Sequence, residues 1–182
     1  MLTKEEIYEN KNEIIALLKS TNRDGIDNVI DFLNKSGYFH LYGSFNHHTY
    51  NGGLAEHSLG VYKLAKKFNS NCNEDSIIIC SLLHDICKTK YNFPEGVEYK
   101  GHGKKSVAII EDFIKFKLTE DERLAIRFHM KGNIQRYILE EGEDYEKAKN
   151  SDLRNLIYKC DKIDAGRYSG ILQKIMWNAI RT

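Results

Sequence analysis

The chain has 182 residues, of which 41% are hydrophobic and 29% are charged, and its formal net charge is +1. This balance is typical of one globular domain and excludes a chain that is disordered throughout. A net charge so close to zero gives no overall field that would favour nucleic acid or membranes. The sequence shows neither a signal-peptide core nor an apolar run long enough to span a bilayer, so we expect a cytoplasmic protein.

Apolar residues recur mostly at helical spacing, and no alternating run is long enough to demand a sheet core. Two capping-box patterns, Thr3 with Glu6 and Thr119 with Glu122, mark helix starts. The predicted helices cover about residues 4–19, 25–35, 54–68, 74–84, 104–116, 120–130, 151–165 and 168–181. We therefore predict an all-α fold, a single domain over residues 1–182 built as a bundle of about seven to eight helices. The long loop at 88–103 has room for a small hairpin.

Ionisable residues fall on the inward faces of three predicted helices. Helix 74–84 is apolar nearly all round, which predicts a buried central position, and His84 and Asp85 stand at its end. His57 and Asp161 each share a helical stripe with apolar residues. Because a buried ionisable group must be paired or bound, these side chains require compensation.

One divalent cation would compensate all of these side chains at once. Imidazole and carboxylate ligands suit zinc or another transition metal, or a mixed site for manganese or iron, and helical bundles commonly build such sites in their cores. An inward histidine is also often a hydrogen-bonded core residue, and an inward aspartate often caps a helix or meets an arginine. Spacing alone leaves both interpretations open.

Three motifs, GGLAEHS, LLHDICK and KCDKIDA, resemble the HD-domain superfamily of metal-dependent phosphohydrolases. The signature of that superfamily is a histidine, then a His-Asp doublet, then a distant aspartate, and the ordered set is specific. The resemblance covers about residues 44–165, and we expect the helices within 4–36 and 168–181 to pack on that region. The metal ligands that it implies are His57, His84, Asp85 and Asp161.

The segment HHTYNGGLAEHSLGV is similar to a branch of the superfamily that includes the HD half of bacterial 3′–5′ exoribonucleases. It also resembles small stand-alone bacterial and phage HD proteins. Family members with a second ion imply His102 and His129 as its ligands, with Asp85 as the bridge, although His102 lies in a Gly-flanked loop and an exposed position would explain it as well. We therefore expect one or two divalent ions (Mn, Fe, Ni, Zn or Mg), without a prediction of which.

The resemblance also implies residues that would contact substrate. Asp85 would position a metal-activated water, and Lys88 would act beside it on the substrate phosphate. Lys104 would add positive charge, and His48 would contact substrate or orient a ligand.

Two further positions near the motifs have open interpretations. Asp164 would support a ligand or pair with Arg167. Cys87 replaces the glycine of the frequent HDIGK motif, where a left-handed backbone would strain it, and we interpret it as a packing change.

The function that these residues predict is hydrolysis of a phosphoester, most simply of a small nucleotide or cyclic nucleotide. A 3′–5′ exonuclease acting on nucleic-acid ends is the second substrate class, disfavoured because the sequence shows no strong basic stripe with aromatic residues. A diiron HD-type oxygenase would use much the same ligands, and a binding module without turnover is the remaining class. We expect no membrane partner, and the sequence gives no basis for predicting oligomeric state or pathway.

Overall fold

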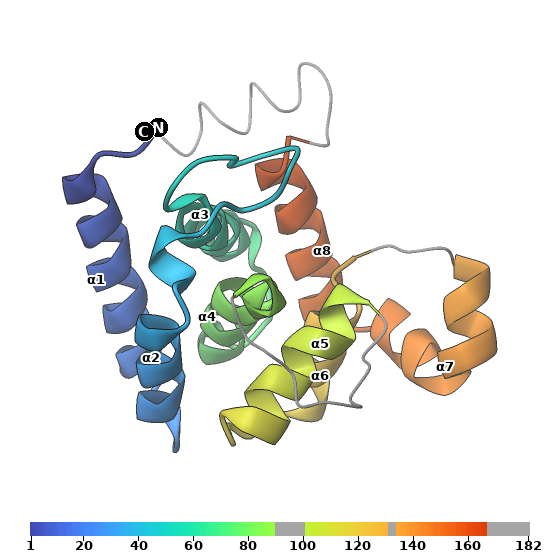
Figure 1. The fold of residues 1–182 in the computed structure, drawn as a ribbon. Coiled ribbons are helices and arrows are strands. Elements are labelled where there is room, and N and C mark those ends of the chain that lie inside the picture. The colour runs from blue at the N-terminus through green and yellow to red at the C-terminus, as the bar shows by residue number, and fades with distance from the viewer. Residues whose placement is uncertain (90–100, 131–133, 167–182) are drawn as a thin grey trace.

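The computed structural model describes residues 1–89, 101–130 and 134–166, with only the backbone described for 134–141. This part of the chain is all-helical, without strands, as predicted (Figure 1). The α-helices are α1 (Lys4–Ser20), α2 (Ile26–Lys35), α3 (Gly53–Phe68), α4 (Glu74–Leu83), α5 (His102–Ala108), α6 (Glu120–Arg127), α7 (Ile134–Lys149) and α8 (Asp152–Asp164). Within the same residues, no helix combines the length and the hydropathy needed to cross a bilayer.

Helix α4 is the centre of the domain, as its uninterrupted apolar sequence predicts. Every residue from Ile77 to Leu83 is buried, and the helix packs against α1, α3, α6 and α8. Figure 1 shows it in the middle of the bundle. Tyr38, fully buried, donates a hydrogen bond from its hydroxyl to the Leu82 carbonyl at 2.7 Å. The end of α4, where the His-Asp doublet follows, is therefore held in the interior.

The helix starts agree with the local sequence signals. Thr3 and Thr119 form complete capping boxes with Glu6 and Glu122. Asn73, the N-cap residue of α4, accepts a hydrogen bond from the Ser76 amide at 3.1 Å. These bonds satisfy amides that a helix start leaves without partners.

Two segments differ in structure from the sequence prediction. Helix α7 was not predicted, because Ile134–Lys149 is strongly charged and interrupted by Gly142. It packs through Tyr145 and Ala148 in a small cluster with residues of α6 and its end, apart from the main core. The predicted helix 104–116 begins earlier, at His102, and changes at Ile109–Phe113 into a π-helical turn.

Other predicted boundaries shift or cannot be compared. The predicted helix 120–130 ends at Arg127, where Phe128 leaves helical geometry. The predicted helix 168–181 and most of the 88–103 loop, with its suggested hairpin, lie outside the described residues.

A buried carboxylate, Glu122, joins three parts of the bundle. Its side chain has no exposed surface, and its two oxygens accept hydrogen bonds from the Arg23 guanidinium at 2.8 and 3.2 Å. It also accepts from the Ser76 hydroxyl and the Thr119 amide, each at 2.8 Å. One side chain thus ties the start of α6 to α4 and to the segment after α1.

We predict that Glu122→Ala lowers the free energy of unfolding by about 3 kcal/mol, because it leaves Arg23 without the carboxylate that compensates it. The matched control is Glu120→Ala on the same helix, whose side chain is 67% exposed and pairs with Lys147 at 3.0 Å. That variant should change stability by less than about 1 kcal/mol. Urea unfolding of both variants measures the difference, and equal losses would contradict the anchoring role of Glu122.

Candidate metal centre

Five ionisable side chains meet at the junction of α3, α4, α6 and α8. His57 lies on α3, Asp161 on α8, and His84 and Asp85 follow the last residue of α4, while His129 follows the end of α6. All five are at most 4% exposed. Figure 1 shows α3, α6 and α8 arranged around α4. The structure thus brings together the four ligands of the predicted motif and one of the two residues predicted for a second ion.

The ligand atoms of these side chains form two overlapping groups that share His84. In the first, His57 Nε2 lies 3.3 Å from His84 Nε2 and 3.2 Å from Asp161 Oδ1. In the second, His84 and His129 face Asp85, with His84 Nε2 3.4 Å from Asp85 Oδ2 and His129 Nε2 3.6 Å from Asp85 Oδ1. Within each group, the candidate ligand atoms all lie within 4.8 Å of one another.

The three imidazoles of these groups are oriented in the same way, with Nδ1 bonded outside the cluster and Nε2 directed into it. A carbonyl oxygen can only accept, so a ring bonded to one through Nδ1 carries its proton there and, when neutral, has a free lone pair on Nε2. This is the arrangement that orients histidine ligands in metal sites. The Nδ1 partners are the carboxylate of Asp164 for His57 (2.6 Å), the carbonyl of Ser81 for His84 (2.8 Å) and the carbonyl of Ile126 for His129 (2.6 Å).

His129 provides the most direct test of whether these residues suit a cation. Its Nε2 is buried and has no hydrogen-bond partner among the described residues, since Asp85 Oδ1 at 3.6 Å lies beyond bonding distance. Leaving such a nitrogen without a partner is costly. A cation would satisfy it, and the mixed nitrogen and carboxylate donor set suits divalent manganese, iron, nickel or zinc. The residues therefore fit a divalent metal ion.

Asp164 is the residue that orients His57, one of the two roles that the sequence left open for it. Gly60 makes this contact possible, because a Cβ at that position of α3 would lie only 2.0 Å from Asp164 Oδ1. The alternative partner, Arg167, lies outside the described residues. His48 Nε2 approaches the same carboxylate at 3.5 Å, from the loop before α3.

The end of α4 is supported by a residue that the sequence analysis did not identify. Ser106 on α5 is fully buried and donates its hydroxyl to the His84 carbonyl at 2.6 Å. The hydroxyl oxygen of Ser106 also accepts a hydrogen bond from the Cys87 amide at 3.3 Å. Cys87 belongs to the 3-10 turn Ile86–Lys88 and has no left-handed backbone, which agrees with a packing change at this position.

A cavity of about 480 Å³ opens onto the cluster. Lys88 lies in its wall with Nζ 2.5 Å from Asp85 Oδ2. The lining residues are Leu41, Tyr42, Gly43, Ser44, Phe45, Asn46, His47, Asp85, Lys88, His102, Met130 and Asp161. One wall is therefore the loop before α3, and the other carries the acidic groups of the cluster.

Three further residues predicted for the second ion or the substrate lie outside the two groups just described. His102 is exposed in the cavity wall, with Nδ1 3.6 Å from Cys87 Sγ, and it belongs to neither group of converging ligand atoms. Lys104 is half-buried and is not one of the residues that line the cavity. His48 faces Asp164 and Glu56, which is compatible with the expected role of orienting a ligand, and its neighbour His47 lines the cavity.

The backbone conformation determines which of the two loop histidines, His47 or His48, lines the cavity. His48 has a φ of 49°, in the left-handed region, so the chain turns between the two residues. The His47 ring centroid lies 4.8 Å from that of His57, and His47, His48 and His57 form a third group of potential ligand atoms. A doublet of identical residues gives no sequence signal for which ring enters the cavity.

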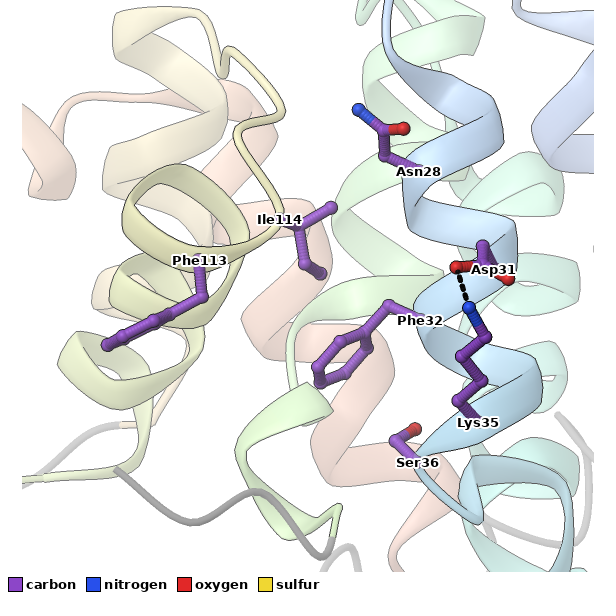
Figure 2. Close-up of a pocket in the computed structure, with 7 residues that line it drawn as sticks. All are labelled: Asn28, Asp31, Phe32, Lys35, Ser36, Phe113 and Ile114. Carbon is purple, nitrogen blue, oxygen red and sulfur yellow. Dashed lines mark hydrogen bonds and ion pairs between the residues drawn. The ribbon is translucent and has the colours of Figure 1, made fainter. Parts of the chain in front are cut away.

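A second groove, of about 430 Å³, lies between α2 and the segment after α5 and shares no residue with this cavity (Figure 2). Its two charged side chains, Asp31 and Lys35, already pair at 2.6 Å along α2. None of the potential metal-ligand groups in the described residues lies there. Among the described residues, each of the potential metal-ligand groups therefore lies at or beside the first cavity.

The comparisons with known proteins agree with this geometry. A family model described as HD domain matches residues 54–166, from the start of α3 to just beyond α8. The chain belongs to the HD-domain superfamily of metal-dependent phosphohydrolases. Comparisons with curated proteins and with solved structures give no significant match. Membership of this family gives the class of chemistry, whereas the substrate depends on the cavity beside the cluster.

Charges within the HD site compensate one another. Burial acts to lower the pKa of His57, but hydrogen bonds to Asp161 and Asp164 outweigh it and raise that pKa to about 9. Burial acts to raise the pKa of Asp161, yet the hydrogen bond from His57 and the neighbouring histidines lower it to about 2. Burial also acts to raise the pKa of Asp85, but the neighbouring His84, His129 and Lys88 outweigh it. They hold the pKa of Asp85 well below its usual value. Both carboxylates are thus ionised and available to a cation at neutral pH.

We predict that Asp164→Asn weakens metal binding by about 10- to 100-fold, because the amide no longer offers His57 a charged acceptor. Asp27→Asn, an exposed position at the start of α2, is the matched control and should bind metal as the wild type does. Titration calorimetry with Mn²⁺ measures both affinities. Equal affinities for the two variants would show that Asp164 does not support the site.

We predict that Mn²⁺ stabilises the protein more as pH rises from 6.5 to 9. In the metal-free protein the folded pKa of His57 is raised to about 9, so its contribution to stability is complete below about pH 6.5 and is lost as pH rises through 9. Metal binding requires the deprotonated ring, so its affinity increases over the same window. Anaerobic thermal unfolding with Mn²⁺ and with chelator should show a widening gap in Tm. A constant or narrowing gap would contradict the coupling.

Proposed function

We propose that this HD protein hydrolyses the phosphoester of a small nucleotide. The observation that carries the proposal is the position of Lys88, whose ammonium lies in the wall of the cavity beside Asp85 and Asp161. A cationic side chain next to a divalent-metal site is the environment that a phosphate group requires. The cavity thus offers a phosphate-binding end formed by residues of the chain itself.

The ligands proposed for the first ion are His57, His84, Asp85 and Asp161. For a second ion, Asp85 would be shared, with His129 and His102 as the further ligands, although His102 stands apart from the converging atoms in this structure. A divalent ion held in this site would offset charge on the phosphoryl oxygens and lower the pKa of a coordinated water.

Side chains around the ion have distinct proposed tasks. Lys88 would donate hydrogen bonds from Nζ to the phosphate oxygens, leaving its present contact with Asp85 Oδ2. Asp85, ionised at neutral pH, would hold the reacting groups in position rather than donate a proton. His47 has its pKa lowered by burial to about 4. It would therefore bind substrate as a neutral ring, without adding charge. Lys104 and His48, which do not line the cavity, would act on substrate only indirectly.

The size of the cavity favours a small substrate. Its volume of about 480 Å³ falls within the range of about 300–1,000 Å³ that is typical of small-molecule sites. A nucleotide or cyclic nucleotide fits that range, which ranks it ahead of a nucleic-acid end. The two alternative chemistries, exonuclease and diiron oxygenase, are separated by the assay below.

We predict oxygen-independent hydrolysis by the Mn²⁺-loaded protein when p-nitrophenyl phosphate, its bis ester, a nucleotide panel and a short oligonucleotide are assayed. Asp85→Ala should lower the rate by at least about a hundredfold, because it removes a ligand shared by the proposed ions. Asp27→Ala, at an exposed site remote from the cavity, is the matched control and should retain full activity.

The other outcomes identify the competing classes. Release of product from the oligonucleotide alone would indicate an exonuclease. A requirement for oxygen, together with a diiron optical signal, would indicate an oxygenase. Bound metal without any turnover would contradict the proposed function and favour a binding module.

A further inference from the structure

Two exposed aromatic rings lie in the wall of the candidate active-site cavity. Tyr42 is 48% exposed and Phe45 is 88% exposed, and both line the same cavity as Lys88. Among the described residues, the other exposed large hydrophobic side chains are Met1 and Tyr8. Exposed apolar surface gathered at one cavity is characteristic of a ligand contact.

The two rings contact each other and still leave much of their surface exposed to solvent. Their centroids are 5.7 Å apart and their planes are tilted by 47°. Because most of the Phe45 ring is uncovered, a flat apolar ligand would bury its surface there at a favourable free energy. Leu41 and Met130 extend the apolar lining of the same cavity.

Hydrogen bonds hold the loop that carries these rings in one conformation. The Ser44 hydroxyl accepts from the amides of Asn46 at 3.1 Å and His47 at 3.2 Å. The Ser44 amide donates to the His47 carbonyl at 3.0 Å, and the Gly43 amide donates to the His48 carbonyl at 2.8 Å. A loop already ordered in this way loses little conformational freedom when a ligand binds.

We propose that Tyr42 and Phe45 bind the base of the substrate, so that the enzyme selects nucleotides over phosphorylated molecules that lack an aromatic ring. This inference rests on the proposed function and names the group that its substrate must carry. The cavity then has two ends, with Lys88 and the metal site for the phosphate and the aromatic pair for the base. Contact with a ring face does not read the edge of a base, so different bases are accepted.

The proposal is tested by equilibrium binding of two probes to the metal-free protein in the presence of chelator, because recognition is then measured without turnover. Adenosine 5′-monophosphate and ribose 5-phosphate are titrated calorimetrically as the two probes. We expect the nucleotide to bind about tenfold more tightly, as a stacked base would require. Tyr42→Ala and Phe45→Ala should each remove most of that difference, whereas Tyr42→Phe and Phe45→Tyr should retain it. Tyr8→Ala, at an exposed ring on α1, is the matched control and should also retain it.

Equal binding of the two probes by the wild-type protein, including no detectable binding of either, would overturn the inference. A preference that survives both alanine substitutions would overturn it as well. Hydrolysis of p-nitrophenyl phosphate by the Mn²⁺-loaded protein tests the proposed function separately. Hydrolysis without a preference for the nucleotide would contradict only the proposed base site. A preference for the nucleotide without hydrolysis would contradict only the proposed function.

Discussion

Mutual compensation of buried charge at the junction of four helices is the constraint on which this structure depends. His57, His84 and His129 share an interior site with Asp85 and Asp161, all almost completely removed from water. Ionised carboxylates in such a position are costly unless each has an opposite charge and hydrogen bonds. His57 supplies both to Asp161 and Lys88 supplies both to Asp85, and a divalent cation would supply more. The packing of α3, α4, α6 and α8 must therefore bring these side chains together.

Close approach of the backbone at two glycines makes the arrangement possible. Gly60 gives the Asp164 carboxylate room to reach His57, and Gly103 lets the start of α5 contact the backbone of Arg127, where a Cβ would lie 2.0 Å from the carbonyl oxygen. The second contact sets α5 against the end of α6, close to His129. The supporting side chains Asp164 and Ser106 then fix His57 and the end of α4. The geometry of the site therefore depends on the two glycines and on the hydrogen bonds of Asp164 and Ser106 as much as on the candidate ligands.

The sequence predicted the features that depend on local pattern. The uninterrupted apolar sequence of α4 indicated the central helix, and the ordered motif identified His57, the His84-Asp85 doublet and Asp161 as neighbours. The capping boxes gave the starts of α1 and α6. Each of these signals comes from residues a few positions apart, or from a pattern that the HD family shares.

Features that depend on tertiary structure were not predictable in the same way. Charged α7 has a weak apolar pattern and is held by a small contact with α6. Which of His47 and His48 faces the cavity depends on one left-handed residue. Ser106 gave no signal, because its partner, the carbonyl of His84, lies 22 residues away in the chain. The place of His102 in the cavity wall, apart from the converging ligands, likewise follows from packing rather than spacing.

If the buried cluster binds a divalent cation, the metal content of the protein must depend on its ligand side chains. The protein is equilibrated with Mn²⁺, passed through a desalting column and analysed by elemental mass spectrometry, with His40→Ala as a control at an exposed histidine. We expect one or two ions per chain in the wild type and in the control, and a loss of bound metal in His57→Ala. Absence of bound metal in the wild type, or full retention in His57→Ala, would contradict the assignment of the site.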